Sequence, residues 1–367
     1  MLRRALLTIR SLKPARPRGR FPSAAWAWPT GDRDLLLRAA ILDDLDAAAA
    51  AFHEWERSFD FDGVDLSRQR LLVAIANRIP PRLLDARDQA RLAGVERKLW
   101  SHCIASLRAA KPLLAAYSAA GIEMMVFKGA VRSVLDIRNL RGRYASEIDL
   151  LVHHADFDRA WQIALDMGWK KMVARVDPHA RTGANLVTGS FGEVDLHRYP
   201  FHQVLPGDAD LADLWARASR HTFLDQQVAI PSPTDRLVLA VAHGGIGSHD
   251  QSDWLIDAAL LIRGGEVDWP LFRDLVAKRR VDVLAEIALS YLGGPLGVPA
   301  PAETLAAVAS RARRAPFRAM LGVLEARPRH DHWVGSSLAR TLARRLRLRA
   351  RSRTIAQLEA DRAAPVA

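Results

Sequence analysis

Residues 121–152 read GIEMMVFKGAVRSVLDIRNLRGRYASEIDLLV. The apolar run Ile122–Phe127 has the length of one β-strand and ends in Lys128 and Gly129, after which a short segment favours a helix. A second apolar run of strand length, Ile148–Val152, follows. The stretch therefore predicts a strand, a glycine turn, a helix and a second strand, which together begin an α/β sheet.

Further strand-length runs continue downstream. They are Trp169–Val176, Ala184–Val187 and Val194–Leu196, and Asp156–Met167 has the pattern of a helix between two of the predicted strands. After Pro231 and Pro233 the periodicity becomes helical again. The helices predicted there are Asp235–His243, Trp254–Ile262, Trp269–Lys278 and Val281–Tyr291.

Helical patterns also precede the sheet. Asp32–Phe59 is predicted as one amphipathic helix, and Leu84–Ala119 as a second that ends at Gly121 in a left-handed cap. We expect an α/β (α+β) fold in which a small mixed β-sheet core is flanked by N-terminal and C-terminal helical regions. The expected divisions are a basic disordered tail (1–31), an N-terminal helical region (32–120), the core (121–230) and a C-terminal helical domain with a basic last helix (231–367).

The charge of the chain points to an anionic partner. The 367 residues carry a formal net charge of +12 with a pI near 10.5, which favours a nucleotide, a nucleic acid or a membrane surface. The excess gathers at the two ends. The last arginine-rich stretch has an apolar stripe of Leu338, Leu342, Leu346 and Ile355, which suits either a solvated helix packed on the domain or a surface for RNA, a partner or a membrane.

The remaining composition excludes several classes of protein. No apolar run approaches the roughly 20 residues that cross a bilayer. The single cysteine, Cys103, forms neither an intramolecular disulfide nor a thiolate metal site. We therefore expect an intracellular, cytoplasmic protein without a transmembrane segment.

Acidic residues recur on the predicted strands. Alternation along SEIDLLV places Glu147 and Asp149 on one face, and alternation along GEVDLHR places Asp195 and His197 on one face together with Glu193. Neighbouring carboxylates repel each other unless a cation lies between them, and Mg²⁺ prefers carboxylates together with substrate phosphates. For the first pair alone, a half-exposed strand with solvated acids is an equally good interpretation.

The turn after the first strand suits an anion. A helix N-terminus offers unpaired N–H groups, Gly129 allows a close approach to the backbone, and Lys128 adds a positive charge. A Lys-Gly pair by itself is usually an ordinary turn. Combined with three carboxylates on two strands, it indicates a two-metal site for phosphoryl transfer.

These motifs resemble the nucleotidyltransferase superfamily of DNA polymerase β, in particular its group of mostly uncharacterised bacterial proteins. The residues that carry the resemblance are Lys128-Gly129, Arg143, Glu147-Ile148-Asp149-Leu150-Leu151-Val152 and Asp195-Leu196-His197. A weaker likeness continues through His243, Trp254, Asp257 and Asp268-Trp269, so that it spans roughly Asp32–Pro299.

The resemblance implies transfer of a nucleoside monophosphate from an NTP to a hydroxyl, with release of pyrophosphate. It implies Mg²⁺ or Mn²⁺ bound by Glu147, Asp149 and Asp195, with Asp195 as the best candidate to deprotonate the acceptor. Lys128 and Gly129 would hold phosphates. The acceptor is a small molecule, a peptide, a protein side chain or RNA. The alternative is a catalytically silent protein of the same fold that binds a nucleotide or RNA.

Two positions depart from the family pattern. The usual Gly-Ser pair is Gly129-Ala130, which lacks a hydroxyl, and the first carboxylate is Glu147 where Asp is usual. The longer side chain places its oxygens one methylene further from the backbone, and the octahedral geometry of Mg²⁺ tolerates little misplacement. The full activity of the site therefore depends on Glu147.

Other residues have two interpretations each. Arg143 either clamps the triphosphate or pairs with Glu147, and His197 either binds a phosphate or orients a carboxylate, or is a half-buried histidine with one hydrogen bond. His243 either ends a helix or covers the nucleotide. Trp254 is expected in the core, and Asp257 is expected to reach its own helix cap or a basic neighbour.

Overall fold

The computed structural model describes residues 20–172, 182–208, 210–247, 251–328 and 334–363. The α-helices are α2 (Asp32–Ile41), α3 (Leu45–Ser58), α4 (Leu66–Ala76), α5 (Ala86–Ala119), α6 (Val131–Leu135), α7 (Phe157–Asp166), α8 (Ala212–Ala216), α9 (Pro233–Gly244), α10 (Trp254–Arg263), α11 (Trp269–Arg279), α12 (Asp282–Gly293), α13 (Ala302–Arg313), α14 (Pro316–Ala326) and α15 (Val334–Ala363). The strands are β1 (Met124–Phe127), β2 (Ile148–Val152), β3 (Lys170–Lys171), β4 (Gly183–Thr188), β5 (Gly192–His197), β6 (Ser219–Phe223) and β7 (Gln226–Ile230).

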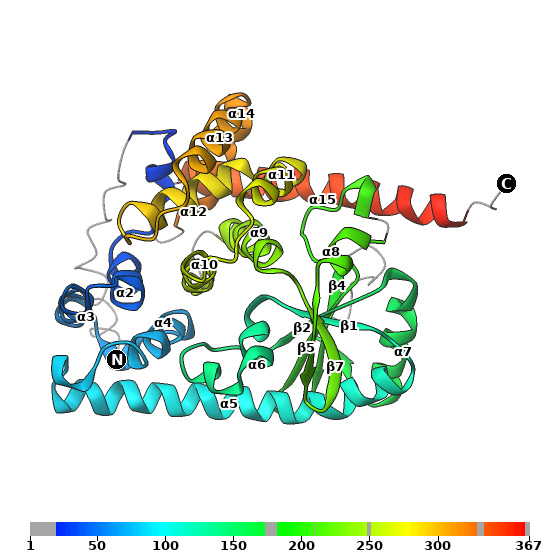
Figure 1. Ribbon diagram of the computed structural model, residues 1–367, viewed down its shortest axis with the longest axis horizontal. Coiled ribbons are helices and arrows are strands. Elements are labelled where there is room, and N and C mark those ends of the chain that lie inside the picture. The colour runs from blue at the N-terminus through cyan, green and yellow to red at the C-terminus, as the bar shows by residue number, and fades with distance from the viewer. Residues whose placement is uncertain (1–19, 173–181, 209, 248–250, 329–333, 364–367) are drawn as a thin grey trace.

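The seven strands form one mixed sheet in the order β3-β4-β5-β2-β1-β7-β6. Strands β1 and β2 are antiparallel neighbours, whereas β2 pairs with β5 in parallel. The predicted α/β fold, with a mixed sheet between helical regions, is confirmed (Figure 1).

Alternation along the central strands divides the sheet into two faces. One set of side chains, which includes Val126, Leu150 and Leu196, joins a core with residues of α5 and α7. On the other face, Phe127 and Leu151 pack with residues of α8 and α9. Since side chains alternate along a strand, the polar residues between the members of the first set face away from α5.

The N-terminal and C-terminal helices share a third core. Residues of α2, α3 and α4 pack with residues of α9 to α12, among them the buried Trp55, Leu237 and Phe272. Figure 1 shows α5 running beneath both this helical part and the sheet, while α15 runs along the opposite side of the molecule. Segments far apart in the sequence thus lie side by side.

Several predicted elements differ from the structure. The predicted helix Asp32–Phe59 is two helices, because the Asp44 carboxylate accepts hydrogen bonds from the backbone N–H groups of Asp46 and Ala47 and thereby begins α3. The predicted strand Trp169–Val176 is limited to Lys170–Lys171 within the described part, and 173–176 lie outside it.

The first 19 residues of the predicted tail also lie outside the described residues. Residues 20–31, however, contain the 3₁₀ helix Ala24–Ala27, in which Ala27 is fully buried. The guanidinium of Arg327 lies 3.6 Å from the centre of the Trp26 ring. This part of the predicted tail is packed on the C-terminal helices.

None of the described helices combines the length and the apolar character that crossing a membrane requires.

Candidate functional site

Strand register brings Lys128 to the first acidic strand. Strands β1 and β2 are antiparallel with Phe127 opposite Asp149, so the residue that follows Phe127 lies beside that carboxylate. Lys128 has a left-handed backbone (φ 55°), and its Nζ donates a hydrogen bond of 2.5 Å to Asp149 Oδ1. The predicted Lys-Gly turn therefore faces the carboxylates.

Parallel pairing brings the second acidic strand to the same place. Asp149 of β2 lies directly opposite Asp195 of β5, and Lys128 Nζ is 3.9 Å from Asp195 Oδ2. His197 Nε2 lies 2.8 Å from Asp195 Oδ2 and 3.4 Å from Asp149 Oδ1. Ligand atoms of Asp149, Asp195 and His197 all lie within 4.8 Å of one another, an arrangement that fits one metal ion.

The charges in this cluster shift one another's pKa values. Burial favours the uncharged form of Asp195, but the charges of His197 and Lys128 outweigh burial and lower its pKa. Burial likewise opposes the charge on His197, yet Asp195 raises the pKa of the imidazole. The pKa of Lys128 is raised by Asp149 and Asp195 against the effect of burial. The pKa shift of each of these three groups therefore favours its charged form.

The pKa of Glu147 shifts in the opposite direction from that of Asp195. Glu147 lies just before β2, and its carboxylate forms no hydrogen bond or ion pair among the described residues. Burial, reinforced by the charge of Asp149, raises the pKa of Glu147 to about 7. Glu147 lines the same pocket as the cluster, although its oxygens are not among the group that lies within 4.8 Å.

A pocket of about 920 Å³ surrounds these residues. Its walls come from the Lys-Gly turn, β2, β5, α9, α10 and the last helix, α15. Basic side chains outnumber acidic ones in the lining. The basic ones are Arg70, Lys128, Arg132, Arg143, Arg236, Arg340, Arg344, Arg347 and Arg351. The volume is large enough for a nucleotide together with part of a second substrate.

One comparison with known proteins decides the family. A family model described as "uncharacterised nucleotidyltransferase" matches residues 71–296, which is more than half of the chain. The chain belongs to this nucleotidyltransferase family. No curated protein and no solved structure gives a significant match. The family resemblance expected from the Lys-Gly turn and the two acidic strands is thus confirmed.

Arg143, which the nucleotidyltransferase pattern includes, does not pair with Glu147. Its Nε donates to Asp257 at 3.0 Å, and its Nη1 donates to Asp253, both on or next to α10. Because Arg143 is only 4% exposed, its charge needs carboxylates that are buried with it, and α10 supplies two. A Cβ at Gly129 would lie 2.9 Å from Arg143 Nη2. Arg143 thus packs beneath the glycine turn, where the sequence suggested a phosphate clamp or a Glu147 partner.

The two expectations for α10 are borne out. Trp254 is buried, and its ring lies so close to Gly244 that a Cβ there would be 2.2 Å away. Asp257 reaches a basic neighbour, Arg143. His243 lines the pocket near the end of α9, and its ring centre lies 4.2 Å from that of His202.

Some residues that line the pocket were not predicted from the sequence. Arg236 of α9 is largely buried, and its guanidinium makes no hydrogen bond or ion pair among the described residues. Its sequence signal is weak, because one arginine in an amphipathic helix is ordinary. The arginine-rich stretch of α15 is evident in the sequence, but the sequence does not indicate which of its arginines face the pocket.

Only one member of the apolar stripe expected on the last helix is buried. Leu338, Leu342 and Leu346 are exposed, whereas Ile355 is buried together with Ala339, Ala343 and Leu358. The first half of the helix therefore packs through its alanines, and the second half through Ile355 and Leu358. Arg340, Arg344, Arg347 and Arg351, spaced three or four residues apart, lie on one side and line the pocket.

Proposed function

We propose that the protein transfers a nucleoside monophosphate from an NTP to the hydroxyl of an acceptor and releases pyrophosphate. The observation that carries this proposal is the register that sets Asp149 opposite Asp195, with the Lys128-Gly129 turn beside them in a basic pocket. Membership of a nucleotidyltransferase family supports the same reaction class.

The donor set fits a hard divalent cation. Asp149 and Asp195 offer carboxylate oxygens from adjacent strands, and Glu147 offers a third carboxylate at the pocket wall. Oxygen ligands of this kind suit Mg²⁺ or Mn²⁺. A bound ion would supply charge neutralisation at the phosphates and a lower pKa of the acceptor hydroxyl. His197, in contact with Asp195, would hold that carboxylate in position.

Basic groups in the pocket lining would bind the phosphates. Arg236 is a largely buried cation without a hydrogen-bonded partner among the described residues, and burial lowers its pKa, so an anion beside it is favoured. Gly129 allows phosphate oxygens to approach the backbone, and Lys128 can turn its ammonium from Asp149 to a phosphate. Positioning and charge of this kind supply most of the catalysis in phosphoryl transfer.

In the proposed reaction, the acceptor oxygen bonds to the α-phosphorus of the NTP. The bond from that phosphorus to the bridging oxygen breaks, and pyrophosphate leaves with the bonding electrons. The hydroxyl proton passes to a carboxylate. Sequence reasoning favours Asp195 as this base, and we keep that assignment, because the raised pKa of Glu147 applies to the site without a metal ion and Glu147 is itself proposed as a ligand of that ion.

Labelled nucleotides test the function. The purified protein is incubated with each α-labelled NTP, Mg²⁺ and cell extract as the source of acceptors, beside Asp149→Asn, Asp195→Asn and the control Asp225→Asn, whose carboxylate is 76% exposed on the β6–β7 turn. The expected result is a labelled product with wild type and the control but not with the two site variants. If no NTP gives a metal-dependent product while nucleotide binding persists, the silent binding protein is the correct interpretation.

A further inference from the structure

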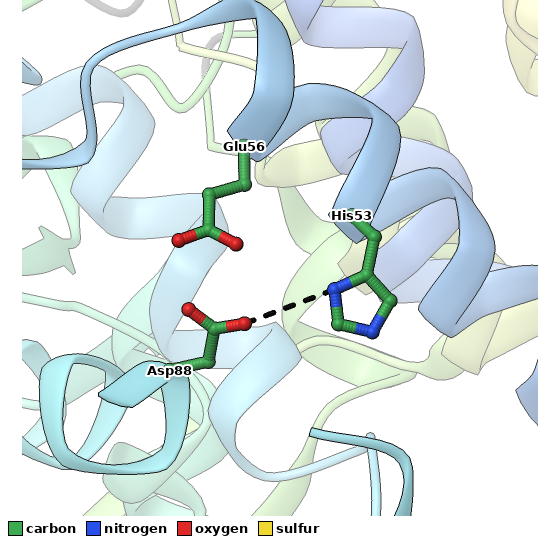
Figure 2. Close-up of side chains that lie close together, drawn as sticks. All are labelled: His53, Glu56 and Asp88. Carbon is green, nitrogen blue, oxygen red and sulfur yellow. Dashed lines mark ion pairs between the residues drawn. The ribbon is translucent and has the colours of Figure 1, made fainter. Parts of the chain in front are cut away.

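A second group of metal-ligating side chains lies in the N-terminal helices. His53 and Glu56 stand three residues apart on one face of α3, and Asp88 lies in the first turn of α5 (Figure 2). One ligand atom of each lies within 4.8 Å of the other two. None of the three lines the nucleotide pocket, so this group is separate from the proposed reaction.

The contacts of His53 determine which of its ring nitrogens is available to bind a metal ion. Its Nε2 lies 3.0 Å from the backbone oxygen of Leu83, which can only accept a hydrogen bond, so the proton is on Nε2. In the neutral ring Nδ1 then carries a lone pair, and Figure 2 shows Nδ1 directed toward Asp88, with 3.7 Å between Nδ1 and Oδ2. In metal sites, the histidine ring usually donates its second N–H to a carbonyl or carboxylate oxygen, which fixes the orientation of the ring.

One oxygen of the buried Asp88 carboxylate lacks a hydrogen-bond partner. Asp88 is 1% exposed, and its Oδ1 has no hydrogen-bond partner. The Glu56 carboxylate points toward Asp88 in Figure 2, so two negative groups face each other. Such a pair is unfavourable unless a proton or a cation lies between its members.

The other charged groups nearby do not remove this conflict. Arg91 of α5 donates to Glu56 Oε1 at 3.2 Å, but it also donates to Asp62 at 2.9 Å, so its charge is divided between two carboxylates. Asp85, at the start of the same helix, adds further negative charge. The N-terminal end of α5 offsets part of the charge of Asp88 but offers no partner to Oδ1.

We propose that His53, Glu56 and Asp88 bind a divalent transition metal ion, with Zn²⁺ as the best match. One imidazole nitrogen and two carboxylate oxygens, completed by water, are a ligand set that Zn²⁺ accepts, whereas Mg²⁺ favours oxygen ligands alone. The side chains of His53 and Glu56 are 36% and 22% exposed, so an ion reaches the group from solvent. The bound ion would tie α3 to the start of α5.

Zinc titration of the full-length protein tests the site. All proteins carry Asp149→Asn and Asp195→Asn, so that the pocket does not compete for the metal, and are stripped with EDTA that is then removed. Calorimetry with ZnCl₂ is expected to detect one site, weakened at least about tenfold by His53→Ala or Asp88→Asn, since loss of even an outer partner of a metal ligand has that effect. Glu54→Gln, an exposed neighbour on α3, is the control and should bind as its parent does.

Thermal melts separate a metal site from an ordinary ion pair. Zn²⁺ should raise the Tm of the parent and leave that of Asp88→Asn unchanged, while in EDTA the Asp88→Asn variant should melt at or above the parent because a carboxylate repulsion is removed. Equal zinc binding by the parent and both variants overturns the proposal. So does a Tm loss in Asp88→Asn that is the same with and without Zn²⁺, since Asp88 would then serve only as a partner of protonated His53.

Discussion

Lys128 Nζ lies 2.5 Å from Asp149 Oδ1, so a protein cation contacts the carboxylate that is proposed to bind metal. The same ammonium is 3.9 Å from Asp195 Oδ2. A divalent ion and Lys128 therefore compete for the same oxygens. Metal binding would release the ammonium toward the phosphates, which couples the metal to nucleotide binding through one side chain.

Replacing Lys128 should change the affinities for the metal ion and for ATP in opposite directions. In Lys128→Met, Mn²⁺ should bind more tightly because its competitor is absent, whereas the affinity for ATP should fall about tenfold, the typical effect of one charge-assisted contact. Calorimetry with Mn²⁺ alone and then with ATP measures both. Lys111→Met, which removes an exposed lysine paired with Asp225, is the control. A parallel loss of both affinities would contradict the competition.

Glu147 should make the stability of the metal-stripped protein depend on pH. Its pKa is raised from 4.5 to about 7, so the folded state binds the proton more tightly than the unfolded state does. The stabilisation is complete below pH 4.5 and is lost as the pH rises through 7, by about 3 kcal/mol. Glu147→Gln should equal wild type at pH 5 and exceed it in free energy of unfolding at pH 8. Urea denaturation in EDTA measures this difference, and identical pH profiles would refute the assigned pKa.

The site could be foreseen where it depends on local pattern. Alternation along two strands placed Asp149, Asp195 and His197 on one face, and the lysine after β1 marked the turn, so their proximity needed only that β2 and β5 be neighbours. The partners of Arg143 could not be foreseen, because Asp253 and Asp257 lie 110 and 114 residues further along the chain.

The β6–β7 hairpin and the packing side of α15 were not predicted either. The β6–β7 hairpin turns at Leu224 and Asp225, both with positive φ, where glycine or asparagine would normally reveal such a turn. Strand β6 is also largely polar and exposed, so it lacks the apolar pattern of a buried strand. The side of α15 that faces the pocket depends on how small residues such as Ala339 and Ala343 pack, which the more obvious leucines concealed.

Arg143 should be required for stability more than for chemistry. Arg143→Ala would leave Asp257 and Asp253 only partly compensated, by Arg132 and Arg70 respectively. Breaking a buried ion pair from one side costs about 3 to 5 kcal/mol. Arg138→Ala removes an arginine that is 84% exposed, and should change the free energy of unfolding by less than about 0.5 kcal/mol. Chemical denaturation compares the two variants. Similarly small losses in the free energy of unfolding for both variants would mean that Arg143 does not stabilise the fold.

The last helix should bind the phosphates of a substrate through only one of its sides. Arg344 and its neighbour Arg345 are both exposed, but only Arg344 lines the pocket, and it forms no ion pair among the described residues. A glutamate at position 344 would turn an attraction into a repulsion within the pocket. A glutamate at position 345 makes the same change in net charge on the solvent side.

Binding of ATP with Mg²⁺ should therefore weaken about tenfold in Arg344→Glu and very little in Arg345→Glu. The effect of Arg344→Glu should diminish as salt rises from about 50 to 200 mM, because exposed charges are increasingly screened. Titration calorimetry at both salt concentrations measures this. Equal losses in the two variants would mean that the helix acts only through the net charge of the protein, and α15 would then have no specific part in the site.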